Sequence, residues 1–194
     1  MIVILSGLSC AGKDTAQNYL VTKGFKNIIS TTSRPIRPKE KEGVEYHFVT
    51  KEEFKNKINN NEFLEHREYH TLLHGVPDVW YYGIELKNIP EDNNVVAVLD
   101  PIGYYALLDK FGKENVKLIW LELDEETRKE RNILRGDYDE SEFTRRNIKD
   151  IETFAGLEDE ANIMINNCGS LEDLHNYLDL AIEELEALSE SRIY

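Results

Sequence analysis

Four short apolar runs lie along the chain, separated by stretches with helical periodicity. The runs cover residues 2–6, 95–100, 116–123 and 161–165. Apolar residues dominate each run, which is typical of strands buried on both faces of a parallel sheet. The pattern therefore predicts an α/β fold with a mainly parallel sheet and right-handed crossover helices.

The stretches between these runs carry start and stop signals of helices. A helix is expected over residues 13–22, ended by Gly24. Thr50-Lys51-Glu52-Glu53 reads as a capping box that opens a second helix to about Ile58. A last helix should follow the capping pair Ser170 and Asp173. Its apolar face, expected to cover the sheet, is made by Leu171, Leu174, Leu178, Ile182 and Leu185.

The segment after the first helix has an extended pattern. Residues 27–31, 45–49 and 62–66 are expected to be extended. Between Thr32 and Pro38, two prolines exclude a helix, so a constrained extended backbone presents Arg34 and Arg37. From Tyr69 to Trp80 the residues Gly75, Pro77 and Asp78 predict a loop.

Residues 124–154 are highly charged and helical, with a break at Arg135-Gly136-Asp137-Tyr138. An ordinary pair of crossover helices is one interpretation. A lid is favoured, because its cationic side chains would stand opposite bound phosphates and its closure would exclude water. Arg128 is expected to pair on the helix surface with glutamates three or four residues away.

Composition narrows the function classes. The chain has 194 residues, 41% hydrophobic and 31% charged, which fits one α/β domain with small inserts. No run approaches the length of a membrane span and no signal region follows Met1, so no membrane partner and a cytoplasmic location are expected. Cys10 and Cys168 are expected to be free thiols.

The formal net charge of −14 argues against a protein that holds nucleic acid by its general surface. Any anion must therefore be met by a local cationic cluster. Two such clusters occur, one with Arg34 and Arg37 and one among the arginines of residues 128–146.

The first apolar run leads directly into a phosphate-binding loop. Gly7 is followed after four residues by Gly12-Lys13, and then by a helix. The glycines let backbone N–H groups turn around phosphate oxygens, the helix N-terminus adds positive potential, and the lysine reaches the terminal phosphates. The expected nucleotide-binding residues are Gly7, Ser9, Cys10, Ala11, Gly12, Lys13, Asp14 and Thr15.

One position departs from the usual loop pattern. The loop normally follows its lysine with Ser or Thr, whose hydroxyl binds Mg²⁺, and here Asp14 stands in that place with Thr15 after it. An alternative is a carboxylate that merely complements the helix dipole. Beside bound phosphates such a carboxylate would be repulsive, so Asp14 is expected to bind the metal directly or through water, with Thr15 as a second candidate.

Over nearly its whole length the chain resembles the guanylate kinase family. The matching pieces lie in the family's order. They are residues 7–13, Ser30-Thr31-Thr32-Ser33-Arg34 with Arg37, residues 43–49, Glu62-Phe63-Leu64-Glu65, Tyr81-Tyr82-Gly83, Asp100 with Gly103, and Arg131 through Arg135-Gly136.

The resemblance implies a P-loop NTPase fold that transfers the γ-phosphoryl group of ATP, with Mg²⁺, to GMP or dGMP. It implies a single domain over residues 1–194, a monophosphate-binding subdomain over residues 30–83 and a lid over residues 124–154. Acceptor-phosphate residues would be Arg34, Arg37, Tyr46 and Tyr82. Guanine would be met by Ser30, Glu65 and Asp100. Lys13, Arg131, Arg135 and Arg146 would act on the transferring group, with Arg145 as the competitor of Arg146.

Physical chemistry supports the role of Glu65. Guanine presents its N1–H and N2 amine as adjacent donors, and one carboxylate can accept from both. Adenine presents a ring-nitrogen lone pair there, so the mismatch would leave buried polar groups unpaired.

Two other functions stay open at this point. Ile84 stands where the family has Ser or Thr near the base, and extra residues lie between Leu72 and Trp80. These departures, with the Lys-Asp-Thr loop, leave room for a nucleoside monophosphate kinase of broader or deoxy-preferring acceptor range. A non-catalytic interaction module is disfavoured, because Lys13 and the lid arginines are retained. The patterns do not distinguish a monomer from a homodimer.

Overall fold

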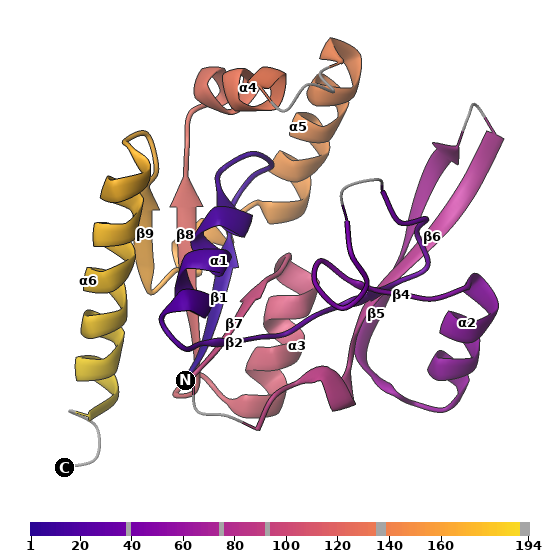
Figure 1. Ribbon diagram of the computed structural model, residues 1–194, viewed down its shortest axis with the longest axis horizontal. Coiled ribbons are helices and arrows are strands. Elements are labelled where there is room, and N and C mark those ends of the chain that lie inside the picture. The colour runs from indigo at the N-terminus through magenta and orange to yellow at the C-terminus, as the bar shows by residue number, and fades with distance from the viewer. Residues whose placement is uncertain (38–39, 74–75, 92–93, 135–138, 191–194) are drawn as a thin grey trace. The chain divides into compact units, whose positions relative to one another are not determined.

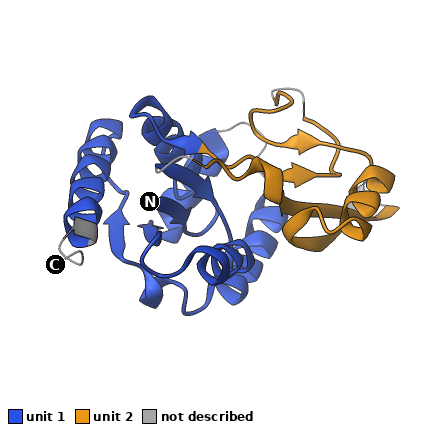
Figure 2. Cartoon of the chain, turned by 90° about the horizontal axis from the view of Figure 1, so that it is seen from below, with its two compact units in different colours: residues 1–26, 93–194 blue, residues 27–92 orange. Residues whose placement is uncertain are grey.

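The computed structural model describes residues 1–37, 40–73, 76–91, 94–134 and 139–190. The chain divides into two compact units, one of residues 1–26 and 93–194 and one of residues 27–92 (Figure 2). The segment 30–83, expected to bind the monophosphate, lies inside the second unit.

The first unit is built on a five-stranded sheet (Figure 1). Strand β1 pairs in parallel with β7 on one side and β8 on the other, and β8 pairs in parallel with β9. The prediction of a mainly parallel sheet is confirmed. In spatial order the strands are β2 (Lys26–Asn27), β7 (Val95–Val98), β1 (Ile2–Ser6), β8 (Val116–Glu122) and β9 (Ile163–Asn166).

Helices cover both faces of this sheet. Helices α1 (Lys13–Thr22) and α6 (Leu171–Glu190) contact each other and pack on one face. The core there includes Val3, Leu20 and Leu178 in one apolar cluster. Because side chains alternate along a strand, β1 also presents apolar residues to the opposite face, where α3 (Pro101–Phe111) contacts β8. Burial on both faces explains the nearly continuous apolar runs.

After β8 the chain forms α4 (Glu125–Leu134) and α5 (Glu140–Phe154), followed by the short helix η2 (Glu158–Glu160). Figure 1 shows α4 at the end of the sheet where β8 finishes. The predicted break at residues 135–138 lies outside the described residues.

Arg128 of α4 is not on the helix surface, so the predicted pairing with nearby glutamates is wrong. It is 3% exposed, with Nε donating to the Leu123 carbonyl at 3.2 Å and Nη2 to Asn147 Oδ1 at 2.8 Å. Within the described part of the chain, Nη1 has no hydrogen-bond partner. The prediction was wrong because the spacing of charges along α4 contains no information about α5, which packs over this side chain.

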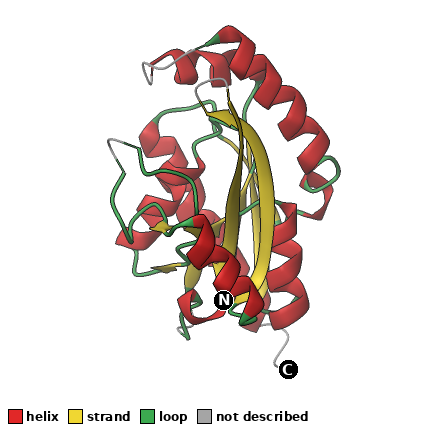
Figure 3. Cartoon of the chain, turned by 90° about the vertical axis from the view of Figure 1, so that its right-hand side faces the viewer, coloured by secondary structure: helices red, strands yellow, loops and turns green. Residues whose placement is uncertain are grey.

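The second unit holds a four-stranded sheet of order β4-β3-β6-β5. Strands β5 and β6 form a long antiparallel hairpin, the long curved pair of strands in Figure 3. The other elements are β3 (Thr31–Thr32), β4 (His47–Phe48), α2 (Lys51–Asn59), β5 (Phe63–Leu73), β6 (Val76–Glu85) and η1 (Leu86–Asn88). The capping box is confirmed, since Glu53 N donates to Thr50 Oγ1 and Thr50 N donates to the Glu53 carboxylate.

The predicted loop over residues 69–80 is wrong, because most of it belongs to this hairpin. Tyr69 pairs with Trp80 across the strands, and their rings stack at 6.3 Å. The indole of Trp80 also donates to Asp78 at 3.0 Å. Residues with turn propensity dominated the local pattern, whereas the pairs that stabilise the hairpin join residues far apart in the sequence. The predicted strand at residues 45–49 shortens to His47–Phe48.

Glu85 is a buried carboxylate at the end of β6. It accepts from Thr31 Oγ1 at 2.5 Å, from Lys57 Nζ at 2.8 Å and lies 3.0 Å from Lys87 Nζ. Burial by itself raises the pKa of Glu85, but the hydrogen bonds from Lys57, Thr31 and Lys87 outweigh it and lower the pKa from 4.5 to about 2. The carboxylate therefore stays ionised within the folded unit.

This pKa predicts a pH dependence of stability. Because the folded pKa lies below the unfolded one, the stabilisation by Glu85 is present above about pH 4.5 and is lost as the pH falls toward about 2. Glu85→Gln should lower the urea midpoint near neutral pH, and its difference from wild type should shrink below pH 4.5. Glu52→Gln, on an exposed part of α2, is the control for charge. A difference that stays constant down to about pH 2 would contradict the assignment.

The Arg128–Asn147 contact predicts a second stability effect. Asn147→Leu removes an acceptor from a buried guanidinium and should lower the free energy of unfolding by about 1–3 kcal/mol. Arg128→Leu combined with Asn147→Leu should be more stable than Asn147→Leu alone, since an apolar pair then replaces a buried charge. Denaturant unfolding of the three proteins measures both effects. A double variant less stable than the single one would show that the charge itself stabilises the helix pair.

Candidate active site

The loop between β1 and α1 closely approaches neighbouring residues at two glycines. A Cβ on Gly7 would lie 2.4 Å from the carbonyl oxygen of Leu121 in β8. Gly12 has φ of 97°, and a Cβ there would lie 2.4 Å from Asn167 Nδ2. Both positions therefore require glycine, for the left-handed backbone at Gly12 and for close approach at both.

Lys13 is the first residue of α1. Its Nζ donates to the carbonyl oxygens of Gly7 at 2.7 Å and Leu8 at 2.9 Å, so the side chain lies across the loop. Asp14 and Thr15 follow in the first turn of α1 and are exposed. The helix N-terminus adds positive potential beside the lysine, as an anion site requires.

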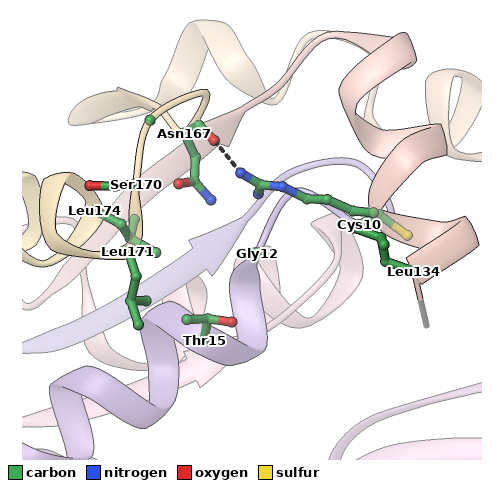
Figure 4. Close-up of a pocket in the computed structure, with 10 residues that line it drawn as sticks. Cys10, Gly12, Thr15, Leu134, Asn167, Ser170, Leu171 and Leu174 are labelled. Atoms are coloured by element: carbon green, nitrogen blue, oxygen red, sulfur yellow. Dashed lines mark hydrogen bonds between the residues drawn. The ribbon is translucent and has the colours of Figure 1, made fainter.

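Asn167 holds the loop from the far side and was missed by sequence analysis. It is buried after β9, and its Nδ2 donates to the Ala11 carbonyl at 2.8 Å. The backbone carbonyl oxygen of Asn167 accepts from Arg131 Nη2 at 2.7 Å, which is the dashed line in Figure 4. The available signal was its position two residues after the fourth apolar run, near the carboxyl end of a parallel strand, where such folds place ligand-binding residues.

A pocket of about 310 Å³ opens beside this arrangement (Figure 4). It is lined by Cys10, Gly12, Thr15, Arg131, Leu134, Asn167, Gly169, Ser170, Leu171 and Leu174. Leu171 is 57% exposed and lines the pocket, so its predicted place on the sheet-covering face is wrong. It lies in the first turn of α6, at the end of the helix that meets the loop rather than the sheet.

Helix α5 contacts the loop through a carboxylate. The backbone N–H of Ser9 donates to Asp150 Oδ2 at 2.8 Å. Asp150 lies three residues after Asn147, on the side of α5 that faces the molecule. An amide of the predicted phosphate-binding loop thus binds an anionic group of the protein itself.

The predicted lid arginines have different environments. Arg131 lies beside the loop, as its contact with Asn167 shows. Arg135 lies outside the described residues. Arg145 and Arg146 both pair with Glu142, at 2.7 Å and 2.6 Å, and the structure does not choose between them. The hydrogen bonds from these two arginines outweigh burial and lower the pKa of Glu142 to about 2.

In the second unit, Arg34 is the centre of a cationic cluster. It is 4% exposed and binds both oxygens of Glu40, at 2.7 and 2.8 Å. Its guanidinium lies 5.3 Å from the ring of Tyr46, and that ring makes an edge contact with Tyr82 at 5.9 Å. Burial raises the pKa of Tyr82, so its hydroxyl remains a donor. Arg37 is exposed, and its backbone N–H donates to Glu40 Oε2 at 2.8 Å.

The residues predicted to meet the base are divided between the units. Glu65 lies on β5 with its side chain 7% exposed, opposite the fully buried Ile84. Ser30 precedes β3, and its carbonyl accepts from His47 N at 2.9 Å. Asp100 belongs to the first unit, where it caps α3 by accepting from Gly103 N at 3.1 Å. Sequence analysis missed Arg67, whose Nη1 lies 3.1 Å from Glu65 Oε2.

Comparison with known proteins gives the family. The family model described as guanylate kinase matches residues 1–184. The chain belongs to the guanylate kinase family. Curated guanylate kinases of Helicobacter hepaticus and Bacteroides thetaiotaomicron are 36% identical over 141 residues and 39% identical over 124 residues. These alignments cover 69% and 60% of this chain but only 63% and 57% of the two relatives.

A solved guanylate kinase from Anaplasma phagocytophilum has the same fold. It superposes with a TM-score of 0.63 at 24% identity, covering 97% of this chain and 86% of that one. The predicted P-loop NTPase architecture of the family is therefore confirmed.

The guanylate kinase fold of this chain offers oxygen ligands for a metal at one place beside the loop. None of the described helices is long and apolar enough to cross a membrane. Among the described residues, no group of three or more His, Cys, Asp or Glu side chains could hold a metal ion. Mg²⁺ needs few protein ligands, because it is usually held by one or two carboxylates together with substrate phosphates. The exposed carboxylate of Asp14 beside Lys13 fits that donor set.

The Ser9–Asp150 contact predicts that Asp150 lowers the affinity of the loop for ATP. A phosphate entering the loop would compete with the Asp150 carboxylate for the Ser9 amide. Asp150→Ala should therefore tighten the binding of ATP by about 10- to 150-fold, in keeping with the contribution of a hydrogen bond to a charged group. Calorimetric titration with ATP and Mg²⁺ measures the change.

The matched control is Glu152→Ala, which removes an exposed carboxylate from the same helix and should leave ATP affinity near wild type. Weaker ATP binding in Asp150→Ala would show that the carboxylate supports the bound donor instead of competing with it.

Proposed function

We propose that this protein transfers the γ-phosphoryl group of ATP to GMP or dGMP. The observation that carries the proposal lies in the second unit, where the buried Arg34 stands among aromatic rings and Glu65 lies on β5 of the same sheet. A guanidinium suits a phosphate and a carboxylate suits the donor edge of guanine. The names of the curated relatives support the same acceptor.

The donor would bind at the loop of the first unit. Its phosphates would accept from the amides of residues 7–12, and Lys13 would exchange the Gly7 and Leu8 carbonyls for phosphate oxygens. The pocket between α4 and the start of α6 has the size and mixed polarity to hold the adenine ring. Asp14 and Thr15 would hold Mg²⁺, which when bound neutralises phosphate charge.

The acceptor would bind on the second unit. Arg34 and Arg37 would hold its phosphate together with the hydroxyls of Tyr46 and Tyr82, and Arg34 would exchange Glu40 for phosphate oxygens. Its guanine would be met by Ser30 and Glu65 of that unit, and the role of Asp100 toward the base stays a prediction. Phosphoryl transfer needs little covalent chemistry from the protein, so holding both substrates in line is the main contribution of these residues.

Residues 124–154 would act as the lid. Arg131, Arg135 and Arg146 would place positive charge on the moving phosphoryl group. Arg146 would first have to leave Glu142, to which both it and Arg145 are paired. Closure would also exclude water, which would otherwise compete as acceptor.

The experiment that tests this function is an assay of ADP formation from ATP and Mg²⁺ with GMP, dGMP, AMP, CMP, UMP or dTMP as acceptor. Turnover is expected with GMP and dGMP. Lys13→Ala should lower kcat by about 100-fold or more while GMP binding is kept, because a charge that stabilises the transferring group is lost.

Other outcomes would contradict the proposal. Comparable turnover with several bases would make this a general monophosphate kinase. No turnover with any acceptor, together with no ATP binding, would favour an interaction module. Wild-type turnover in Lys13→Ala would remove the loop from the donor site.

A further inference from the structure

Two charged side chains of opposite sign lie together on β5. Glu65 and Arg67 are two residues apart, so they share one face of the strand. Arg67 Nη1 lies 3.1 and 3.3 Å from the two carboxylate oxygens of Glu65. The Glu65 side chain is 7% exposed and that of Arg67 is 30% exposed. The carboxylate is thus deeply placed, with the guanidinium next to it and open to solvent.

Arg67 also lies beside the residues proposed to hold the acceptor phosphate. Its partner across the hairpin is Tyr82, which contacts Tyr46 at 5.9 Å and Tyr69 at 6.5 Å. The partner of Glu65 is Ile84, which is fully buried and has no polar side-chain atom. The side chain of Ile84 therefore offers a base no hydrogen bond, whereas Glu65 and its charged neighbour on the same face of the hairpin can offer them.

The pair forms a donor beside an acceptor. A carboxylate only accepts hydrogen bonds, whereas a guanidinium only donates and carries five N–H groups. Guanine presents the matching order along one edge, with the acceptor O6 next to the donors N1–H and the N2 amine. Adenine presents a donor amine where guanine has O6 and a lone pair where guanine has N1–H. It is mismatched at both positions.

We propose that Arg67 is a specificity-determining residue that donates to the O6 of the guanine base while Glu65 accepts from N1–H and the N2 amine. The inference rests on the proposed function, because it concerns the acceptor of that reaction. In this arrangement Arg67 supplies the donor that Ile84 lacks. The carboxylate has lone pairs enough to keep its contact with Arg67 and accept from the base at the same time.

Two other roles of Arg67 would give different results. If Arg67 only orients Glu65, its loss weakens recognition of the N2 amine. If it binds the acceptor phosphate, its loss weakens every nucleotide equally. Analogues altered at one atom of guanine separate these cases. 6-Thio-GMP replaces O6 by a weaker acceptor and keeps N1–H and N2, while IMP keeps O6 and N1–H and lacks the N2 amine.

The test is Arg67→Met, which keeps an unbranched apolar stem and removes the donors. For wild type and variant, kcat/KM and the equilibrium dissociation constant are measured with GMP, 6-thio-GMP and IMP. We expect the variant to lose about 10- to 100-fold in kcat/KM for GMP, the usual discrimination of one well-formed contact to a base. Its preference for GMP over 6-thio-GMP should fall toward one, while its preference for GMP over IMP stays at the wild-type value.

Lys55→Met is the matched control. Lys55 is exposed on α2, where its ammonium lies 5.5 Å from the ring of Tyr81. Tyr81 and Tyr82 are adjacent in β6 and point to opposite faces of the sheet. The control therefore removes the same charge from the other face of the unit, and it should leave all three substrates at wild-type values. Thermal unfolding of both variants checks that the fold is kept.

Each remaining result overturns the proposal. A reduced preference for GMP over IMP with unchanged preference over 6-thio-GMP would make Arg67 a positioning residue for Glu65. Equal losses for all three nucleotides would place Arg67 on the phosphate, and no loss for GMP would remove it from the site. The binding measurements distinguish failure of the proposed function from failure of the proposal for Arg67. A wild-type protein that binds GMP without turnover fails the proposed function, yet its Arg67→Met variant still reports on base recognition.

Discussion

The donor side of this protein depends on how closely the loop of residues 7–12 approaches the sheet. Gly7 lies against the carbonyl of Leu121, and Gly12 lies against the amide of Asn167. At either point a side chain would meet these neighbouring atoms, so the loop can approach this closely only with glycine there. Asn167 extends this support to Arg131, because its side chain binds Ala11 of the loop and its backbone carbonyl accepts from Arg131 of α4. In this structure the Ser9 amide and the Lys13 ammonium are bound by the protein's own oxygens, which a phosphate would have to replace.

Charged groups that the proposed reaction uses are paired within the protein itself. Lys13 binds loop carbonyls, Arg34 binds Glu40, and Arg145 and Arg146 share Glu142. Substrate phosphates would replace these partners, so the buried guanidinium of Arg34 need not be left unpaired before substrate binds. This arrangement also suits an acidic chain, in which local carboxylates are available to hold each arginine before substrate binds.

Much of the fold could be predicted because it follows from local patterns. The four apolar runs became β1, β7, β8 and β9, and the helix over residues 13–22 and the capping box at Thr50 were confirmed. The hairpin of β5 and β6 could not be predicted from turn residues, since cross-strand pairs such as Tyr69 and Trp80 stabilise it. The environment of Arg128 was missed for the same reason, because α5 covers it from a distant part of the sequence.

For the candidate site, too, local features could be predicted from the sequence and long-range contacts could not. By itself the sequence determined which groups are present and how they are spaced: the glycines and lysine of the loop, Arg34 and Arg37 between prolines, and Glu65 on an extended segment. Spacing sets local backbone geometry, and local geometry decides which atoms a short segment can present. Only the tertiary structure decided the partners, bringing Asn167 to Ala11, Asp150 to Ser9, and Tyr82 opposite Arg67. Those contacts join elements through packing and strand register, and no spacing along one segment encodes which distant segment will lie beside it.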